Sequence, residues 1–421
     1  LISKDKLLQY LEFTEDNFYR YCKLIKDSNN NIDETNPLLW QYGHVIFFYI
    51  NLILRNLNNL EYDFNKYKGF IEFYDSHKTP LENRNSKNML DFNTCIDLYQ
   101  LIMVILKNYL KKNEIGVLES YLIMLGILHN EMHNEAFIFT LFSYKIKVNY
   151  PLIEYKYKEY LIRDISFIDY CKGSFIQGSN ELNNKLVFDN EMPCFKKDVE
   201  EFSISKYPIT ESMYLEFVKN NGYTTRKYWC RNGHLWLKKN NITLPKYWIK
   251  KDNVYFKEIN NECYVVETNL PMSNISYYEA CAYCKFKNVR LPTETEYEYC
   301  ATNMGTTLYP WGNREPENNL CNINYNKNLV SITEYKNGDN KKGISQLIGN
   351  IWEWCQEPIY PYDGFKIDPV YREMSYPFFG FKKICKGGCF AVPDFLIHPR
   401  YRNAQYPDCR IQFIGFRVCK I

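Results

Sequence analysis

The first 150 residues of this 421-residue chain place apolar residues at α-helical spacing, and this pattern constrains the fold more than any other feature. It recurs in four stretches, near residues 3–27, 37–57, 94–113 and 116–146. Apolar residues three and four positions apart gather on one helix face, which must be buried against other helices. The polar segment YDSHKTPLENRNSKN separates the second stretch from the third. We therefore predict an up-down four-helix bundle with one longer connection.

The character of the sequence changes at about residue 151. Pro and Gly punctuate short strand-like runs, and Trp and Tyr gather between them. Helical spacing stands out in two stretches, 210–223 and 276–288. A chain of this length has ample material for two or three domains with cores of their own. We predict three parts: a helical bundle over 1–150, a linker over 151–166 and a loop-rich α+β domain over 167–421.

Two of the six histidines lie four residues apart in the fourth helical stretch, within LHNEMHNEA. Four residues turn a helix by about 400°, so the imidazoles of His129 and His133 leave the same face about one turn apart. Two neutral imidazoles placed in this way can hold one metal ion. Glu131 and Glu135 lie about 200° from the nearer histidine, and we expect neither to join that ion. Asn130 follows the first histidine, so the HExxH pattern of a zinc protease is excluded.

A third ligand must come from another segment, and His44 is the candidate. It lies in the apolar run LLWQYGHVIFFYINLIL of the second helical stretch, whereas His77 lies in a loop, His234 follows a Gly and His398 precedes a Pro. Three histidines from two helices would leave up to three positions open on an octahedral ion. Nitrogen ligation suits zinc, copper and iron alike, so these residues alone do not select the metal.

Composition and patterning exclude several partner classes. The formal net charge is +3 and no dense Lys/Arg run occurs, so we expect no nucleic-acid partner. The longest apolar runs, such as VIFFYINLIL, are about half a membrane span, and no signal-peptide pattern opens the sequence, so we expect no membrane partner. The 15 cysteines are scattered, which favours buried free thiols in a cytoplasmic protein. The CxxC of Cys281 and Cys284 falls in a predicted helix, and no second CxxC pairs with it.

The second half resembles a known family in several blocks that agree in order and spacing. The blocks are FSISKYPITESMYLEFVKNNGY, PMSNISYYEACAYCKFKNVRLPTETEYEYCA, LYPWGN, LIGNIWEWC, KGGCF and FIGFRVC. They are similar to the formylglycine-generating-enzyme fold, a C-type-lectin-like α+β domain, over about residues 165–421. The first half resembles the DinB-like helical bundle. The implied fold is an α+β multidomain protein, with a DinB-like four-helix bundle followed by the C-type-lectin-like domain.

The two halves together resemble the sulfoxide synthases of ergothioneine biosynthesis. YGHVIFFY holds the first histidine, LHNEMHNEA holds the other two, VFDNEMP follows the linker, and YPYDGF and HPRYRN lie near the end. In that family three histidines hold a mononuclear non-haem Fe(II), which here would be His44, His129 and His133. The resemblance implies an O2-dependent enzyme with small-molecule substrates. It would join cysteine or γ-glutamylcysteine to the imidazole C2 of Nα-trimethylhistidine and give a sulfoxide.

The resemblance also implies roles for residues outside the histidines. A tyrosine delivers a proton in that family, and Tyr362 of IYPYDGF is its best match, with Tyr360 as the runner-up. A substrate carboxylate requires a cation. The candidates for substrate binding are Arg84, Gln405, Arg402 and Arg410. Because the metal would come from one half and these groups largely from the other, we expect a cleft between the halves, faced by residues 359–365 and 402–410.

Several alternatives remain for the second half. Some members of the fold bind calcium near the GNIWEW block, which makes Asn350 and Glu353 candidate ligands of a Ca2+ ion. Formylglycine formation needs a close cysteine pair, but the next cysteine after Cys389 is Cys409, twenty residues on. The alternatives to an ergothioneine-type enzyme are an ovothiol-type enzyme, which attaches cysteine to unmethylated histidine at C5, and a non-catalytic lectin-like module. The segment HPRYRNAQYPDCRIQFIGFRVC favours the ergothioneine type.

Overall fold

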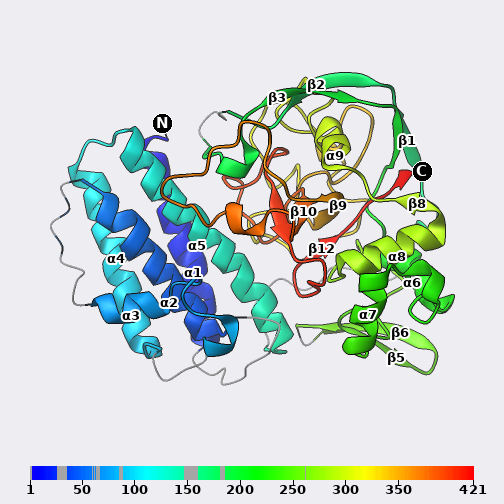
Figure 1. The fold of residues 1–421 in the computed structure, drawn as a ribbon, viewed down its shortest axis with the longest axis horizontal. Helices are drawn as coiled ribbons and strands as arrows, with labels where there is room; N and C mark the ends of the chain where they lie inside the picture. The colour runs from blue at the N-terminus through cyan, green and yellow to red at the C-terminus, as the bar shows by residue number, and fades with distance from the viewer. Residues whose placement is uncertain are drawn as a thin grey trace. The chain divides into compact units, whose positions relative to one another are not determined.

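The chain forms two compact units in the computed structural model, one over residues 1–148 with 182–186 and one over the rest of 149–421 (Figure 1). The predicted boundary at residue 150 and most of the predicted linker lie outside the described residues, so the predicted domain bounds stay predictions. The structure describes residues 2–25, 36–58, 60, 62, 67–84, 89–146, 160–180, 185–260 and 262–421.

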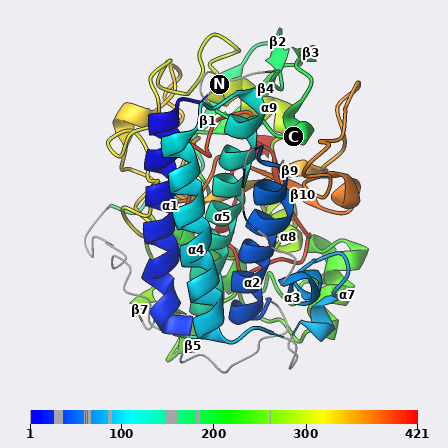
Figure 2. The same ribbon diagram turned by 90° about the vertical axis from the view of Figure 1, so that its left-hand side faces the viewer.

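Four long helices make up most of the first unit, one in each predicted stretch. They are α1 (Lys4–Ile25), α2 (Leu38–Phe48), α4 (Phe92–Lys112) and α5 (Val117–Ser143). Helices α1 and α2 each pack against both α4 and α5, and Figure 2 shows the four side by side. Helix α2 continues through a π-helical segment, η1 (Tyr49–Ile53), and a 3-10 turn, η2 (Leu54–Asn56). The N-terminal unit is therefore helical as predicted, while its likeness to DinB proteins stays a prediction.

The connection between the second and third long helices holds an element that the sequence did not predict. Helix α3 (Lys68–Phe73) has only six residues, and a 3-10 turn, η4 (Leu81–Asn83), follows it. Helix α3 packs against α2. Helix α3 lies just before the polar segment 74–88 that was predicted as a loop, and η4 lies within that segment.

Buried polar contacts fix the rotation of α5, the helix that carries two histidines. The Tyr99 hydroxyl on α4 donates to Asn130 Oδ1 at 2.7 Å. Asn134 Nδ2 donates to the Thr14 carbonyl on α1 at 3.2 Å and to Glu131 Oε1 at 3.1 Å. A buried polar group that is left without a partner costs free energy, so these bonds favour one setting of α5 about its axis.

Across its described residues the second unit has four α-helices and two four-stranded sheets, so it is α+β as predicted. The helices are α6 (Glu211–Lys219), α7 (Arg231–Lys239), α8 (Tyr277–Lys287) and α9 (Glu294–Ala301). Helices α6 and α8 lie in the predicted stretches, and α7 and α9 were not predicted. Capping boxes begin α8, at Ser276 and Glu279, and α9, at Thr293 and Glu296, which explains their sharp starts.

The first four-stranded sheet brings the end of the chain back to the start of this unit. Its order is β1-β4-β13-β8, so the last strand lies between strands from much earlier in the sequence. Its members are β1 (Phe167–Tyr170), β4 (Phe202–Ser205), β13 (Cys419–Lys420) and β8 (Val289–Arg290). Cys419 pairs with Ile204 on one side and Arg290 on the other.

The second four-stranded sheet has the order β11-β10-β9-β12. Its strands are β11 (Asn403–Gln405), β10 (Lys383–Lys386), β9 (Trp352–Pro358) and β12 (Ile414–Gly415), of which only the β9–β12 pair is parallel. The smaller sheets pair β2 (Gly173–Gln177) with β3 (Phe195–Val199), and β5 (Trp248–Lys251) with β6 (Val254–Ile259) and β7 (Glu262–Val265).

A buried core joins the two larger sheets to α9. It includes Ile204 of β4, Tyr297 of α9, Cys355 of β9 and Ile384 of β10. Among the cysteines with described side chains, none forms a disulfide. Cys300, Cys355 and Cys419 belong to this core and are buried, as expected. Within the described residues, no helix is both long enough and apolar enough to cross a membrane.

Candidate metal site

The three predicted histidines come together inside the first unit. His44 projects from α2, and His129 and His133 project from α5, which packs against α2. One ring nitrogen from each histidine lies within 4.8 Å of the others, a spacing that lets them share one ion. Among the described residues, this is the one group of three or more His, Cys, Asp or Glu side chains placed to hold a metal. Glu131 and Glu135 are not part of it, in agreement with their predicted directions.

Aromatic rings hold two of the imidazoles in place. The Trp40 ring stacks on His44 with centroids 5.1 Å apart and a 12° interplanar angle. Phe48 stacks on His129 at 3.6 Å and 7°. Trp40 and Phe48 each lie four residues from His44 on α2, so they leave the same side of the helix one turn below and above it. These contacts remove rotamer freedom from the imidazoles, which favours a preorganised site.

A backbone carbonyl determines which nitrogen of His44 is free for a metal. His44 Nδ1 lies 2.7 Å from the Tyr74 carbonyl oxygen, which can only accept a hydrogen bond. The neutral ring must therefore carry its proton on Nδ1, and the lone pair is on Nε2. A carbonyl partner of this kind is the usual companion of a metal-binding histidine.

Burial keeps all three imidazoles neutral, which is the form that binds metals. Loss of hydration lowers the pKa of His44 to about 4, against the opposing effect of its hydrogen bond to Tyr74. The same burial holds the pKa values of His129 and His133 well below their usual range, and the neighbouring histidines lower them further. His133 Nδ1 is buried without a hydrogen-bond partner among the described residues, as expected of an atom whose partner is not part of the chain. The donor set and its protonation state thus fit a divalent transition metal.

Arg84 lies close to the histidines and makes polar contacts with neutral groups. Its Nε donates to the Thr79 carbonyl at 2.9 Å, Nη1 to Asn36 Oδ1 at 2.6 Å and Nη2 to the Ser76 carbonyl at 2.9 Å. The guanidinium carbon lies 4.1 Å from the centroid of the Trp40 ring. Within the described residues, no carboxylate forms an ion pair with Arg84, so its charge is available to an anionic group.

Tyr362 lies in the second unit and makes its polar contacts there. Its hydroxyl donates to Glu294 Oε1 at 3.2 Å and accepts from Gln177 Nε2 at 3.4 Å. Burial raises the pKa of Tyr362 well above its usual value, and the charge of Glu294 adds to the rise. Tyr360 is 57% exposed. The predicted approach of Tyr362 to the metal joins the two units and stays a prediction, as does the cleft between them.

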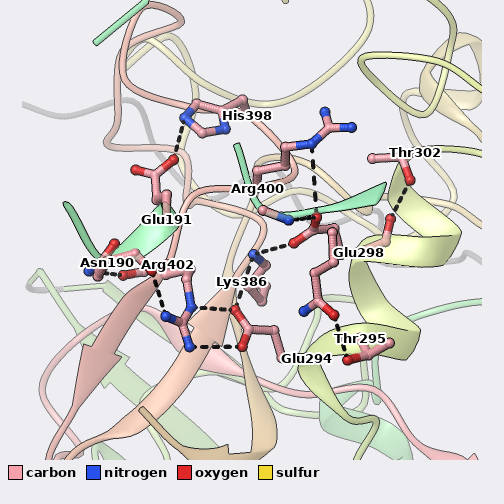
Figure 3. Close-up of polar contacts among 12 residues, drawn as sticks. Asn190, Glu191, Glu294, Thr295, Glu298, Thr302, Lys386, His398, Arg400 and Arg402 are labelled. Carbon is pink, nitrogen blue, oxygen red and sulfur yellow. Dashed lines mark hydrogen bonds and ion pairs between the residues drawn. The ribbon is translucent and has the colours of Figure 1, made fainter. Parts of the chain in front are cut away.

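Arg402 belongs to a buried ionic cluster (Figure 3). Its Nε and Nη2 donate to the two oxygens of Glu294 at 2.7 and 3.0 Å, and the residue is 3% exposed. Lys386 Nζ lies 3.7 Å from Glu294 and 3.5 Å from Glu298, and Arg400 lies 3.9 Å from Glu298. Burial alone would raise the pKa of Glu294, but Arg402 and Lys386 hold it below the usual value. This pairing favours a structural role for Arg402 over the predicted binding of a substrate carboxylate.

Arg410 is paired in the same way. Its Nε and Nη2 donate to the two oxygens of Glu279, at 3.0 and 2.9 Å, and Nη2 also donates to the Leu244 carbonyl. Gln405 ends β11 and pairs in register with Lys383 of β10. Its proposed contact with substrate remains untested. Of the three predicted arginines, only Arg84 is without a carboxylate partner among the described residues.

Residues 166–421 match the family described as the sulfatase-modifying factor enzyme 1-like domain. The chain belongs to this family. The relatives include three proteins named hercynine oxygenase. The one from Mycobacterium tuberculosis is 31% identical over 250 residues, and the alignment covers 58% of each chain. The one from Mycolicibacterium thermoresistibile is 30% identical over 255 residues, covering 58% of this chain and 56% of the relative.

The chain is also related to the formylglycine-generating enzyme of Mycobacterium tuberculosis. It is 24% identical over 298 residues, covering 59% of this chain and 96% of the relative. The chain spans less than two thirds of the length of the three hercynine oxygenases that it matches. The names of these relatives and the matched family both agree with the resemblance stated from the sequence.

The GNIWEW block of this family member has internal partners. Asn350 Oδ1 accepts from Asn322 Nδ2 and from the Val330 amide, and Asn350 Nδ2 donates to Gln346 Oε1 and the Val330 carbonyl. Glu353 accepts two bonds from Arg417, at 2.7 and 2.8 Å. Both side chains are thus engaged by protein groups, which favours their structural role over the predicted Ca2+ site.

Sequence reasoning missed the groups that orient the histidines. Trp40 and Phe48 could have been found, because the four-residue spacing that pairs His129 with His133 also pairs each of them with His44. Tyr74 could not, because its carbonyl belongs to a segment with no helical periodicity. The partners of Arg402 and Arg410 had no signal either, since Glu294 and Glu279 lie more than a hundred residues away in the chain.

Proposed function

We propose that this chain is a non-haem Fe(II)- and O2-dependent sulfoxide synthase of the ergothioneine type. It would join the sulfur of cysteine or γ-glutamylcysteine to the imidazole carbon of Nα-trimethylhistidine. The reaction is balanced as thiol plus imidazole C–H plus O2 giving a sulfoxide and one water, with O2 taking up four electrons. The observation that carries the proposal is the neutral trio of His44, His129 and His133, in a chain that is related to hercynine oxygenases.

The three imidazoles would hold the iron. When bound, Fe(II) supplies the redox chemistry that O2 activation needs and a common attachment point for the two substrates. Three ligands leave room for added groups on the ion. The stacked rings of Trp40 and Phe48 keep two of the imidazoles in place and shield them from water.

Arg84 is the proposed partner of a substrate carboxylate. Three of its five N–H groups donate to neutral acceptors, and the other two have no partner among the described residues, so the proposal assigns them to an incoming anion. Its guanidinium covers the Trp40 ring, which stacks on His44, and this places its charge beside the histidine site. Arg402 and Arg410 are already paired with carboxylates and have no such role in this proposal.

Tyr362 is the proposed source of a proton. Its raised pKa keeps the phenol protonated at neutral pH, and Gln177 and Glu294 hold the hydroxyl in place. In the proposal its Oη proton passes to the oxygen atom that ends as water. The hydroxyl must turn from Glu294 to do so, and the charge of Arg402 then remains to balance that carboxylate.

The test is a product assay under controlled oxygen. The protein is loaded with Fe(II) without oxygen, mixed with trimethylhistidine and either cysteine or γ-glutamylcysteine, and then exposed to O2. Mass spectrometry should find the sulfoxide with one of the two thiols, and the His129→Ala protein should give none. A product only from unmethylated histidine, coupled at C5, would assign the ovothiol-type reaction instead. No coupled product from any pair, with iron bound, would refute the proposal.

A further inference from the structure

We propose that the segment from Tyr67 to Arg84 is a tautomer lock on His44, built so that its Nε2 is always the nitrogen offered to the metal. The inference rests on the proposed metal site and concerns a positioning role that neither the sequence nor the relatives point to. Its central contact is the 2.7 Å hydrogen bond from His44 Nδ1 to the Tyr74 carbonyl.

The end of α3 supplies the acceptors. The last carbonyls of a helix have no partner inside that helix and must be satisfied from outside. Here α3 ends at Phe73, whose carbonyl accepts from Trp40 Nε1 at 3.3 Å, and the next carbonyl, that of Tyr74, accepts from His44. Two consecutive carbonyls thus bind two side chains that lie one helical turn apart on α2.

Gly43 gives the Tyr74 ring the space that this approach requires. A Cβ at position 43 would overlap three atoms of that ring. The Tyr74 hydroxyl accepts a hydrogen bond from the Leu90 amide at 2.7 Å, and the residue is 2% exposed. The ring is therefore held against the bare backbone of α2, and its carbonyl is held against His44.

Arg84, at the end of the segment, contacts the stacked rings of Trp40 and His44 through Trp40. It binds the carbonyls of Ser76 and Thr79, so it ties together the chain that follows Tyr74. Its guanidinium covers one face of Trp40, whose ring in turn stacks on His44. The segment therefore acts on one imidazole in two ways: the Tyr74 carbonyl contacts His44 directly, and the Arg84 guanidinium acts through the Trp40 indole of α2. A neutral histidine that is fixed in one tautomer has no proton to move before it binds a metal.

The first measurement is on the metal-free protein. In 15N-histidine-labelled protein, two-bond 1H–15N correlations distinguish the two neutral tautomers, and a His44→Gln sample assigns the signal. We expect His44 to be in the Nδ1–H form at pH 7. The Nε2–H form, or an equal mixture, would overturn the lock. If the protein binds no metal at all, the proposed function fails, but this measurement still decides the lock.

The second measurement compares three helical Gly→Ala variants. In Gly43→Ala the Tyr74 ring must shift, so we expect a mixture of His44 tautomers and a 10- to 100-fold weaker Kd for Fe(II), measured by anaerobic competition with a chromophoric chelator. Gly69→Ala on α3 meets nothing within 4 Å and should match the native protein. Gly126→Ala on α5 approaches the Tyr49 ring at 2.6 Å, so it strains the packing elsewhere in the same unit and should leave the His44 tautomer unchanged.

The outcomes separate the lock from general damage. A tautomer change in Gly126→Ala as large as in Gly43→Ala would show that any loosening of the helices is enough, and would overturn the proposal. An unchanged tautomer and Kd in Gly43→Ala would do the same. If Gly43→Ala does not fold, Trp40→Phe replaces it, because this variant keeps a ring against His44 but removes the donor to Phe73. It should shift the tautomer ratio in the same direction.

Discussion

At the scale of single residues, each of the three histidines can offer one nitrogen lone pair to a metal ion, but the chain holds each of them differently. His44 has a carbonyl and an indole, His129 has a phenyl ring, and His133 keeps a buried nitrogen without a partner in the described chain. A site with three ligands has no spare one to replace a loss. Each histidine is therefore expected to be necessary for metal retention.

His129→Ala should abolish iron binding. Two imidazoles remain, and the ion loses a ligand from the helix that supplies two of the three. After anaerobic loading and desalting, elemental analysis should find about one iron per chain in the native protein and almost none in the variant. His234→Ala, in α7 of the second unit, is the control and should keep its iron. If His129→Ala kept the native iron content, the assignment of the three histidines as the metal site would be wrong.

Tyr362→Phe should separate proton delivery from folding. The variant loses the hydroxyl bonded to Glu294 and Gln177 but keeps the ring that packs beneath Arg402, 4.0 Å from its guanidinium carbon. Iron content and melting temperature should stay near native values, while sulfoxide yield falls and O2 is spent on oxidising the thiol. Tyr360→Phe, at an exposed position, is the comparison. Loss of yield only in Tyr360→Phe would move the role to Tyr360, and full yield in both would exclude the YPYDGF segment from proton delivery.

At the scale of elements, buried ion pairs connect helix α9 to other segments of the second unit. Helix α9 has the sequence ETEYEYCA, and its three glutamates at 294, 296 and 298 are all buried. Each is near a cation: Arg402 for the first, Arg290 for the second, Lys386 for the third. A polar pattern of this kind hides a buried helix from any search for apolar periodicity, which is why α9 was not predicted.

Glu191 predicts a pH dependence for this unit. It ends the 3-10 turn η5 (Asp189–Glu191), fully buried, with Oε2 3.2 Å from His398 Nε2. Burial raises the pKa of Glu191 to about 8. A carboxyl whose folded pKa exceeds its unfolded value binds its proton more tightly when folded. Its favourable contribution is therefore complete below about pH 4.5 and is lost as the pH rises toward 8.

The measurement is denaturant unfolding between pH 6 and 8.5 for the native protein and for Glu191→Gln. The glutamine cannot ionise, so the native protein should lose stability relative to the variant across this range, by a few kcal/mol at most. His398→Asn tests whether the neighbouring ring contributes to the slope. Parallel curves for the native and Glu191→Gln proteins would show that Glu191 ionises freely when folded, against its complete burial.

At the scale of the whole molecule, the proposed reaction needs groups from both units. The candidate metal ligands and Arg84 belong to the first unit, and Tyr362 belongs to the second. The predicted cleft can be tested without activity by placing a paramagnetic ion in the histidine site. Mn2+ is paramagnetic and broadens the signals of nearby nuclei, whereas Zn2+ does not.

A single fluorotyrosine at position 360 gives the probe, since this side chain is exposed and lies two residues from Tyr362. We expect its 19F signal to broaden with Mn2+ and to stay sharp with Zn2+. A second sample with fluorotyrosine at position 255, on β6, serves to compare the response at another part of the same unit. No Mn2+ broadening at position 360 in a protein that binds the ion would contradict a site shared by the two units.

The sequence by itself determined the helices that carry the candidate metal ligands and the two-part organisation of the chain. Helical spacing is a local property, so it placed α1, α2, α4 and α5 and put His129 and His133 on one face. The apolar helical surroundings of His44 are also a local property, and they pointed to it as the third candidate ligand. The ordered motifs of the second half identified its family, because several independent blocks agreed in order and spacing.

Only the tertiary structure decided what each polar side chain binds. Arg402 and Arg410 have the charge that a substrate carboxylate requires, but they form ion pairs with Glu294 and Glu279. The tautomer of His44 depends on the carbonyl of Tyr74, thirty residues away on a connection without periodicity. Hydrogen bonds and ion pairs join atoms within about 3 Å whatever their distance along the chain. Their partners are therefore fixed by how the elements pack, which the pattern of a single sequence does not contain.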